Sequence, residues 1–127
     1  MKSILLAGVL LQAALLGPAG AADGKADECG LASFYATVSK ETASGEDTLP
    51  ESFTAAHRTL PFGTLIRVEN KKNGRWTVVR ITDRGPTIKE RIIDISQAAA
   101  RILDMSGLAQ VCLSIVSVPE SQPVAGK

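Results

Sequence analysis

The sequence predicts a small, mainly β domain of about six strands with one short helix, folded as a barrel or a sandwich. Three observations support this prediction. Most segments with clear periodicity alternate in polarity and are rich in β-branched residues. An Asn-Gly pair favours a tight hairpin between two of these segments. Only one segment has the spacing of an amphipathic helix.

The strands can be assigned in chain order from this alternation. The expected strands are residues 31–38, 64–69, 76–81, 92–95 and 110–118. Residues 71–74 join the second and third of these strands, and Asn73-Gly74 supplies the turn. Trp76 is expected to pack beside this hairpin rather than to act as a sugar-stacking platform.

The single helix is expected at residues 97–103. Ser96 has the side chain of a good N-cap, because its hydroxyl can accept a hydrogen bond from the first turn. Ala98, Ala99, Ile102 and Leu103 fall on one stripe of this helix, which would face the core.

Composition excludes several classes of function. The chain has 14 basic and 13 acidic residues, a net charge of +1, 45% apolar residues and 21% charged residues. This balance argues against nucleic-acid binding and against disorder. Two cysteines and one histidine are too few for a zinc site of Cys and His ligands, so we expect no structural metal site.

The N-terminal residues 1–21 resemble a secretory signal peptide. A positive start precedes an apolar run at residues 4–16, which ends at Gly17-Pro18. The alternative is a transmembrane anchor, but this run is shorter than the roughly 20 residues that span a bilayer. Val9 stands where a lipoprotein site needs cysteine. We therefore expect a periplasmic or secreted protein without a stable membrane anchor.

The mature chain is expected to form one domain at residues 29–118, with a polar leader at 22–28 and a flexible tail at 119–127. In an oxidising compartment, Cys29 and Cys112 would pair near the two ends of this domain. Such a disulfide contributes on the order of 4 kcal/mol in the chain-entropy model. Two free buried thiols are the alternative. We expect a monomer.

Three segments are difficult to explain as scaffold. Residues 42–47 form a loop of small residues that ends in two carboxylates. Residues 53–63 contain the only histidine, His57, among short side chains. Asp83 follows a predicted strand directly, at the position where a strand end brings a side chain to the rim of a barrel.

Together these segments resemble the rare lipoprotein A (RlpA) family of septal lytic transglycosylases. The similarity extends over nearly all of the predicted domain. The segments that match, in the family's order, are residues 32–35, 42–46, 54–64, 68–70, 73–75, 83–86 and 91–96. The resemblance implies a six-stranded double-psi β-barrel with one short helix and a shallow glycan groove, a fold also found in expansins and barwin-like plant proteins.

The resemblance also implies a reaction and a substrate. A lytic transglycosylase of peptidoglycan cleaves the MurNAc–GlcNAc bond by attack of the muramoyl C6 hydroxyl, which leaves a 1,6-anhydro end. An acid must protonate the leaving oxygen, and intramolecular attack needs no metal or cofactor. The expected partners are peptidoglycan glycan strands.

The resemblance points to Asp83, Glu46 and His57 as catalytic residues. Asp83 is the first candidate for the acid, although spacing leaves the choice between Asp83 and Glu46 open, and His57 would position groups or relay a proton. The expected substrate-binding residues are Tyr35, Asp47, Arg84 and Asp94. The structural alternatives are that Asp83 fixes its turn, that His57 is a hydrogen-bonded core residue, and that Glu46 is solvated.

The sequence departs from the family pattern after Tyr35. Residues 36–41 replace a longer Gly-rich stretch that would form one wall of the groove, so activity itself is in question. Two further functions remain open. One is a non-catalytic, expansin-like module that binds glycan or loosens the wall, and the other is a secreted barwin-like domain that binds a protein.

Overall fold

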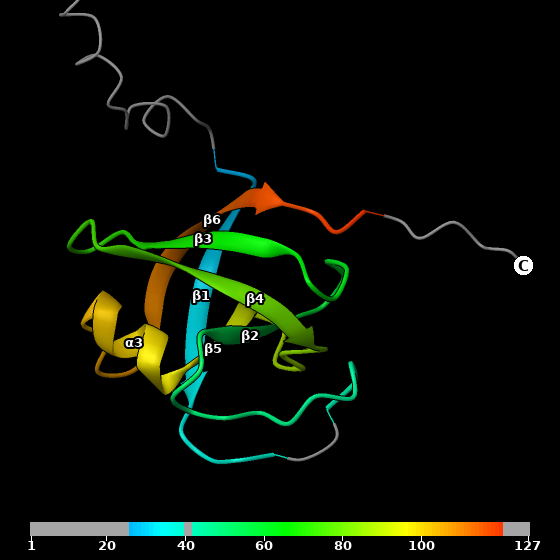
Figure 1. The fold of residues 1–127 in the computed structure, drawn as a ribbon. Helices are drawn as coiled ribbons and strands as arrows, with labels where there is room; N and C mark the ends of the chain where they lie inside the picture. Colours follow the sequence, from blue (N-terminus) through cyan, green and yellow to red (C-terminus); the bar gives the residue numbers. More distant parts are fainter. Residues whose placement is uncertain (1–25, 40–41, 121–127) are drawn as a thin grey trace, which may run out of the picture.

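The computed structural model describes residues 26–39 and 42–120, which form a closed six-stranded barrel with one helix beside it (Figure 1). The elements are β1 (Glu28–Tyr35), β2 (Thr54–His57), β3 (Leu65–Asn70), β4 (Trp76–Asp83), β5 (Arg91–Ser96), α3 (Gln97–Leu103) and β6 (Ala109–Ser117). The predicted signal peptide, most of the predicted leader and most of the predicted tail lie outside these residues. No helix within the described ranges is long and apolar enough to cross a membrane.

The strands follow one another around the barrel in the order β1-β5-β2-β4-β3-β6, and β6 pairs again with β1. The pairs β1/β5 and β2/β4 are parallel, and the other pairs are antiparallel. The prediction of a mainly β barrel with one short helix is confirmed. The closed order places β2 between β4 and β5, although β3 separates β2 from both of them in the sequence.

Alternating side chains of the strands fill the barrel. The large core residues are Ile66, Val68, Val79, Ile81, Ile93, Ile95, Leu103, Val111 and Leu113, each at most 1% exposed. These residues are mostly β-branched, as expected for a pleated, buried surface. The core gives the strand ends a rigid support.

Strand β2 lies within residues 53–63, where the sequence pattern predicts no strand. All four residues of β2 are buried, so the strand shows no alternation of apolar and polar side chains. It is also short and consists of Thr, two Ala and His. The segment has the hydrogen bonding of a strand because β4 and β5 pair with it on both sides.

Strand β1 begins and ends three residues earlier than the predicted strand at 31–38. The reason is its pairing with β6, in which Cys29 lies opposite Cys112. The two cysteines form a disulfide with an S–S distance of 2.05 Å, which confirms the predicted pairing over two free thiols. The last residue of the predicted polar leader, Glu28, therefore belongs to the barrel.

The helix and the hairpin are joined by side-chain hydrogen bonds. Ser96 caps the helix as predicted, because its Oγ accepts from the Ala99 backbone N–H at 3.2 Å. At the other end, the side-chain amides of Asn70 and Asn73 both donate to the Leu103 carbonyl oxygen, at 2.9 and 3.1 Å. The β3–β4 hairpin is thus attached to the end of α3, on one side of the barrel (Figure 1).

Candidate functional site

Four neighbouring strands bring two carboxylates close together. Asp83 at the end of β4 pairs with Ala56 of β2, Ala56 pairs with Asp94 of β5, and Asp94 pairs with Ser33 of β1. The two aspartates are therefore two strands apart, about 9.5 Å between their backbones. The methyl group of Ala56 between them leaves room for a ligand.

A pocket of about 120 Å³ opens at this place. Its lining residues are Tyr35, Thr37, Ser39, Thr48, Ala55, Ala56, Thr82, Asp83 and Asp94. Ser39 and Thr48 exchange two backbone hydrogen bonds. Together with Thr37, they supply one wall of the pocket.

Asp94 is a carboxyl group with an unfavourable environment for its charge. Burial raises the pKa of Asp94, and the nearby charge of Asp83 raises it further. The hydrogen bond that Ser33 Oγ donates to Oδ1 at 3.1 Å and the charge of Arg91 act in the opposite direction. A raised pKa favours the protonated form, which is the form that can donate a proton.

Asp83 is held by the backbone on both sides of it. Its Oδ1 accepts hydrogen bonds from the backbone N–H groups of Ala43 and Arg84, each at 2.9 Å. The Ala43 contact ties the 42–46 loop to the end of β4, and Ser44 N–H adds a bond to the Thr82 carbonyl at 3.2 Å. Both of these bonds use Oδ1, and no hydrogen bond to Oδ2 comes from residues 26–39 or 42–120.

Tyr35 closes the pocket on the β1 side. Its hydroxyl forms a short hydrogen bond with Thr54 Oγ1. Burial raises the pKa of the Tyr35 phenol, and the charges of Asp94 and Asp83 add to this effect. Tyr35 therefore stays a neutral hydroxyl beside the two carboxyl groups.

Glu46 lies outside the pocket lining. Its carboxylate forms a bidentate ion pair with Arg80, at 2.7 and 3.0 Å. The hydrogen bond from Arg80 lowers the pKa of Glu46. This environment favours a charged carboxylate that holds the loop, and it does not favour a proton donor.

His57 also lies outside the pocket lining, and every polar atom of its ring has a partner. Nδ1 accepts from the backbone N–H groups of Thr59 and Leu60, both at 3.1 Å. Because Nδ1 is an acceptor, the ring proton is on Nε2, which lies 2.9 Å from Glu28 Oε1. The ring is buried and fixes the turn that follows β2.

The Arg84 side chain forms hydrogen bonds with the same turn. Its Nη1 donates to the carbonyl oxygens of His57 and Leu60, at 3.2 and 2.9 Å, and its guanidinium lies 4.0 Å from the centre of the Phe62 ring. Asp47 is exposed on the loop that carries Glu46. Among the predicted site residues, the structure brings Asp83, Asp94 and Tyr35 together in one pocket.

Sequence reasoning missed three residues that shape this pocket. Ser33 donates to Asp94, Thr54 bonds to Tyr35, and Ala56 separates the carboxylates. Only Ser33 carried a usable signal, because it lies two residues before Tyr35 in a predicted strand and so shares its face. The other two belong to β2, the strand that showed no periodicity.

The pocket combines a half-buried acid, a second carboxylate and a hydroxyl. Within residues 26–39 and 42–120, no group of three or more His, Cys, Asp or Glu side chains is arranged to hold a metal ion. The set fits proton transfer to and from a neutral substrate, with one carboxyl group as the donor and the other as an acceptor or as a stabiliser of positive charge.

Comparisons with known protein families agree with the sequence motifs. Residues 27–113 match the family model described as lytic transglycolase. A probable endolytic peptidoglycan transglycosylase RlpA of a Nostoc strain is 52% identical over 93 residues, which are 68% of this chain and 25% of that protein. The endolytic peptidoglycan transglycosylase RlpA of Campylobacter jejuni is 43% identical over 96 residues, 72% of this chain and 35% of that protein. The chain thus spans between a quarter and about a third of these relatives.

Two solved structures share the fold. One is a Streptomyces papain inhibitor, with a TM-score of 0.56 and 24% identity over 72% of this chain and 97% of that one. The other is an expansin of Clavibacter michiganensis, with a TM-score of 0.54 and 19% identity over 73% of this chain and 52% of that one. At these identities the likeness supports the barrel architecture alone.

Proposed function

Because this chain belongs to the lytic transglycolase family of RlpA-like double-psi β-barrels, we propose that it cleaves glycan strands of peptidoglycan and leaves 1,6-anhydro-MurNAc ends. The observation that supports this most directly is the pair Asp83 and Asp94 on either side of Ala56 in one pocket. The curated relatives are named as endolytic peptidoglycan transglycosylases, which gives the substrate class.

Asp94 is the proton donor in this proposal. Burial raises the pKa of Asp94, which favours its protonated form relative to that of an exposed aspartate. The proton passes to the glycosidic oxygen as its bond to the muramoyl C1 breaks. The GlcNAc residue then leaves with a free hydroxyl.

Asp83 is the second carboxylate. It faces the positive charge that develops at C1 and accepts the proton of the C6 hydroxyl as that oxygen bonds to C1. The two backbone N–H groups on Oδ1 fix its orientation, which is the kind of preorganisation that a reaction within one sugar residue requires. A proton returns from Asp83 to Asp94 through solvent before the next turnover.

Glu46 and His57 are positioning residues in this proposal. Glu46 holds the 42–46 loop through Arg80, and this loop supplies the Ala43 N–H to Asp83. His57 fixes the turn that also receives the Arg84 guanidinium. Tyr35 binds the sugar with its hydroxyl. The substrate lies outside the cytoplasm, in agreement with the signal peptide predicted at residues 1–21.

The test is incubation of the mature domain with peptide-stripped glycan strands, followed by mass spectrometry of the products. We expect anhydro-ended fragments from the wild type and from the control E90Q, which changes an exposed carboxylate of the loop before β5. We expect none from D83N. Binding of the strands without any product would instead support the non-catalytic, expansin-like alternative.

A further inference from the structure

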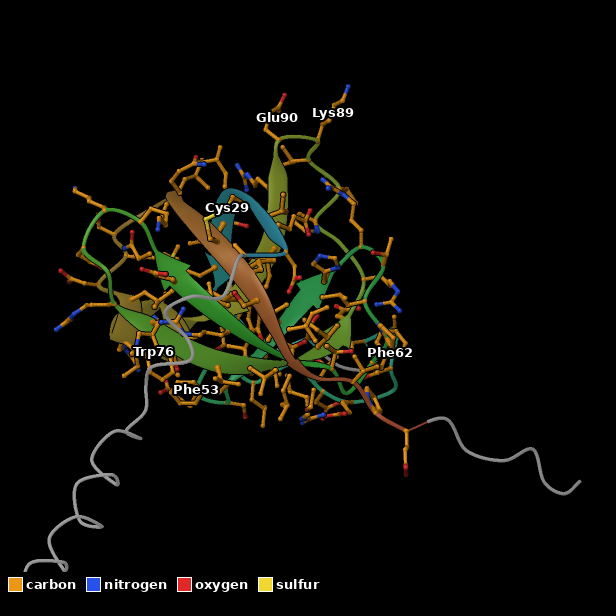
Figure 2. The ribbon with its side chains drawn as sticks, turned by 90° about the horizontal axis from the view of Figure 1, so that it is seen from above. Cys29, Phe53, Phe62, Trp76, Lys89 and Glu90 are labelled. Carbon is orange, nitrogen blue, oxygen red and sulfur yellow. A yellow bond between two sulfur atoms is a disulfide. The ribbon has the colours of Figure 1, made fainter. Side chains whose placement is uncertain are left out.

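A second hollow lies at the opposite end of strand β4 from the carboxylate pocket. Its volume is about 420 Å³, and it is lined by Gly74, Arg75, Trp76, Arg101 and Ile102. Asp83 is the last residue of β4 and Trp76 the first, so the two sites are about 23 Å apart along the strand. Figure 2 shows Trp76 at the outer edge of the barrel, on the side opposite Phe62.

Trp76 was expected to pack beside the hairpin, but it is 52% exposed. The Arg67 guanidinium lies over the Trp76 ring, 4.6 Å from its centre, and Trp76 lines the open hollow. Ile102 of α3, 46% exposed, forms an apolar wall of the same hollow. A large aromatic surface left in water at the edge of a hollow indicates a surface that a ligand can cover.

The hollow has a fixed shape because its two sides are bonded to each other. Asn70 and Asn73 of the hairpin both donate to the carbonyl oxygen of Leu103, at the end of α3. On the helix side, Arg101 forms a bidentate ion pair with Glu51, at 2.8 and 3.2 Å. Arg75 and Trp76 on the hairpin are therefore held opposite Arg101 and Ile102 on the helix.

The charge of this end differs from that of the carboxylate pocket. Residues 67–76 contain four basic residues and one acidic residue, a net charge of +3. Arg67 and Lys71 both lie near that one carboxylate, Glu69, at 3.5 and 3.9 Å. In the described part of the chain, neither Lys72 nor Arg75 forms an ion pair. Among the described residues that line the carboxylate pocket, two are aspartates and none is basic.

We infer that this hollow binds a sugar ring that carries a carboxylate, with the ring against Trp76 and the carboxylate against Arg75. The inference rests on the proposed function for its ligand class, because glycan strands of peptidoglycan combine both features. The carboxylate has two sources, the lactyl ether of the muramoyl residue and the stem peptide. Residues 67–76, at the basic end of β4, carry a net charge of +3 and attract such a group more strongly than the two aspartates of the pocket do.

The single tryptophan of the chain gives a direct measurement. Titration with the peptide-free disaccharide GlcNAc-MurNAc is expected to change the Trp76 fluorescence in a saturable manner, and neutral chitobiose is expected to bind much more weakly. R75Q should weaken the disaccharide response about tenfold. The matched control K72Q, a basic residue of the same hairpin that does not line the hollow, should change it less than twofold.

A second titration with a muropeptide, which carries the stem peptide, distinguishes the two sources of carboxylate. A response to the peptide-free disaccharide assigns the lactyl group, and a response to the muropeptide alone assigns the stem peptide. In a parallel sedimentation assay, purified sacculi should bind W76L about tenfold less well than they bind the wild type. No fluorescence change with either ligand, or an equal response of the wild type and R75Q, would overturn the inference.

These measurements separate the inference from the proposed function. A saturable Trp76 response without anhydro-ended products would leave the binding site standing and contradict the proposed reaction. Anhydro-ended products without any Trp76 response would support the proposed reaction and contradict the binding site at the hollow. D83N should bind the disaccharide at the hollow as the wild type does, because Asp83 lies at the other end of β4.

Discussion

Two consecutive residues of strand β2, Ala56 and His57, lie in contrasting surroundings. Ala56 separates two carboxyl groups in an open pocket, and one of them has a raised pKa. On His57, both ring nitrogens are occupied by the protein itself. Because successive side chains of a strand point to opposite faces, neighbours in the sequence can belong to different parts of the mechanism.

The comparison teaches that a motif mixes residues of two kinds. Asp83 and Asp94 line the pocket, whereas the side chains of His57 and Arg84 form hydrogen bonds with the turn after β2. Arg58 belongs to the second kind, because its guanidinium donates to four carbonyl oxygens between Pro86 and Arg91. Variants of the first kind should lose activity, and variants of the second kind should lose stability.

D94N, like D83N, is expected to have the largest effect. Removing the proton donor should lower the rate of strand cleavage about 10²–10⁴-fold without unfolding the domain. The measurement is the rate of appearance of anhydro-ended products, with circular dichroism as the check on folding. Retention of the wild-type rate by D94N would remove Asp94 from the chemistry.

The pH profile sharpens the same assignment. If Asp94 is the proton donor, the activity of the wild type should fall as pH rises through the raised pKa of that group. S33A removes a hydrogen bond that lowers this pKa, and the alkaline limb of the activity profile should therefore move to higher pH.

The free energy of unfolding should also fall as pH rises, because burial of the charged form of Asp94 is unfavourable. The wild type should lose stability relative to D94N as pH rises through the pKa.

Among the variants that are expected to lose stability, removal of the disulfide should have the largest effect on the free energy of unfolding. The double variant C29S/C112S opens a link between residues 83 positions apart and should lower the free energy of unfolding by about 2–5 kcal/mol. Urea denaturation measures the change. At temperatures where the variant remains folded, its rate of cleavage should stay near that of the wild type, because neither cysteine lies in the pocket.

H57A should have a smaller effect on stability. The substitution leaves the backbone N–H groups of Thr59 and Leu60 without their acceptor, at a cost of about 1–3 kcal/mol. E28Q keeps an acceptor for Nε2–H and should cost less than H57A. Thermal unfolding of both variants measures these losses. If folded H57A lost as much activity as D94N, His57 would take part in the chemistry and the distinction drawn on β2 would be wrong.

The sequence was sufficient for most of the fold. The mainly β class, the helix with its Ser96 cap, the 71–74 turn and the disulfide follow from local patterns or from the compartment, and the choice of a barrel over a sandwich follows from the family resemblance. Strand β2 could not be predicted, because it is buried on both sides and pairs only with strands distant in the sequence. The closed order of the strands is likewise a property of long-range pairing.

The site was predictable in part. Asp83, Asp94 and Tyr35 were singled out and do line one pocket. Their convergence depends on the register of β1, β5, β2 and β4, which no local pattern specifies. The same limit applies to His57, whose partner Glu28 lies 29 residues earlier on another strand. Residue types can nominate candidates, but long-range pairing decides which of them remain free to react.

The smallest effect is expected for E46Q. The ion pair between Glu46 and Arg80 is 45% and 42% exposed, so its loss should cost less than about 1 kcal/mol and less still at high salt. Because the Arg80 hydrogen bond lowers the pKa of Glu46, this stabilisation is present above the unfolded-state pKa and is lost as pH falls through the folded-state value. A double-mutant cycle of E46Q with R80Q, followed by thermal unfolding at two pH values, isolates the pair.

The activity of E46Q decides between the two carboxylates that the sequence left open as the acid. If Glu46 only holds the 42–46 loop, cleavage should fall less than tenfold, and R80Q should cause a similar loss because it releases the same loop. A loss as large as that of D94N, with R80Q still active, would mean that the Glu46 carboxylate itself acts on the substrate. Glu46 would then belong with the residues that react with the substrate, and not with those that only position other groups.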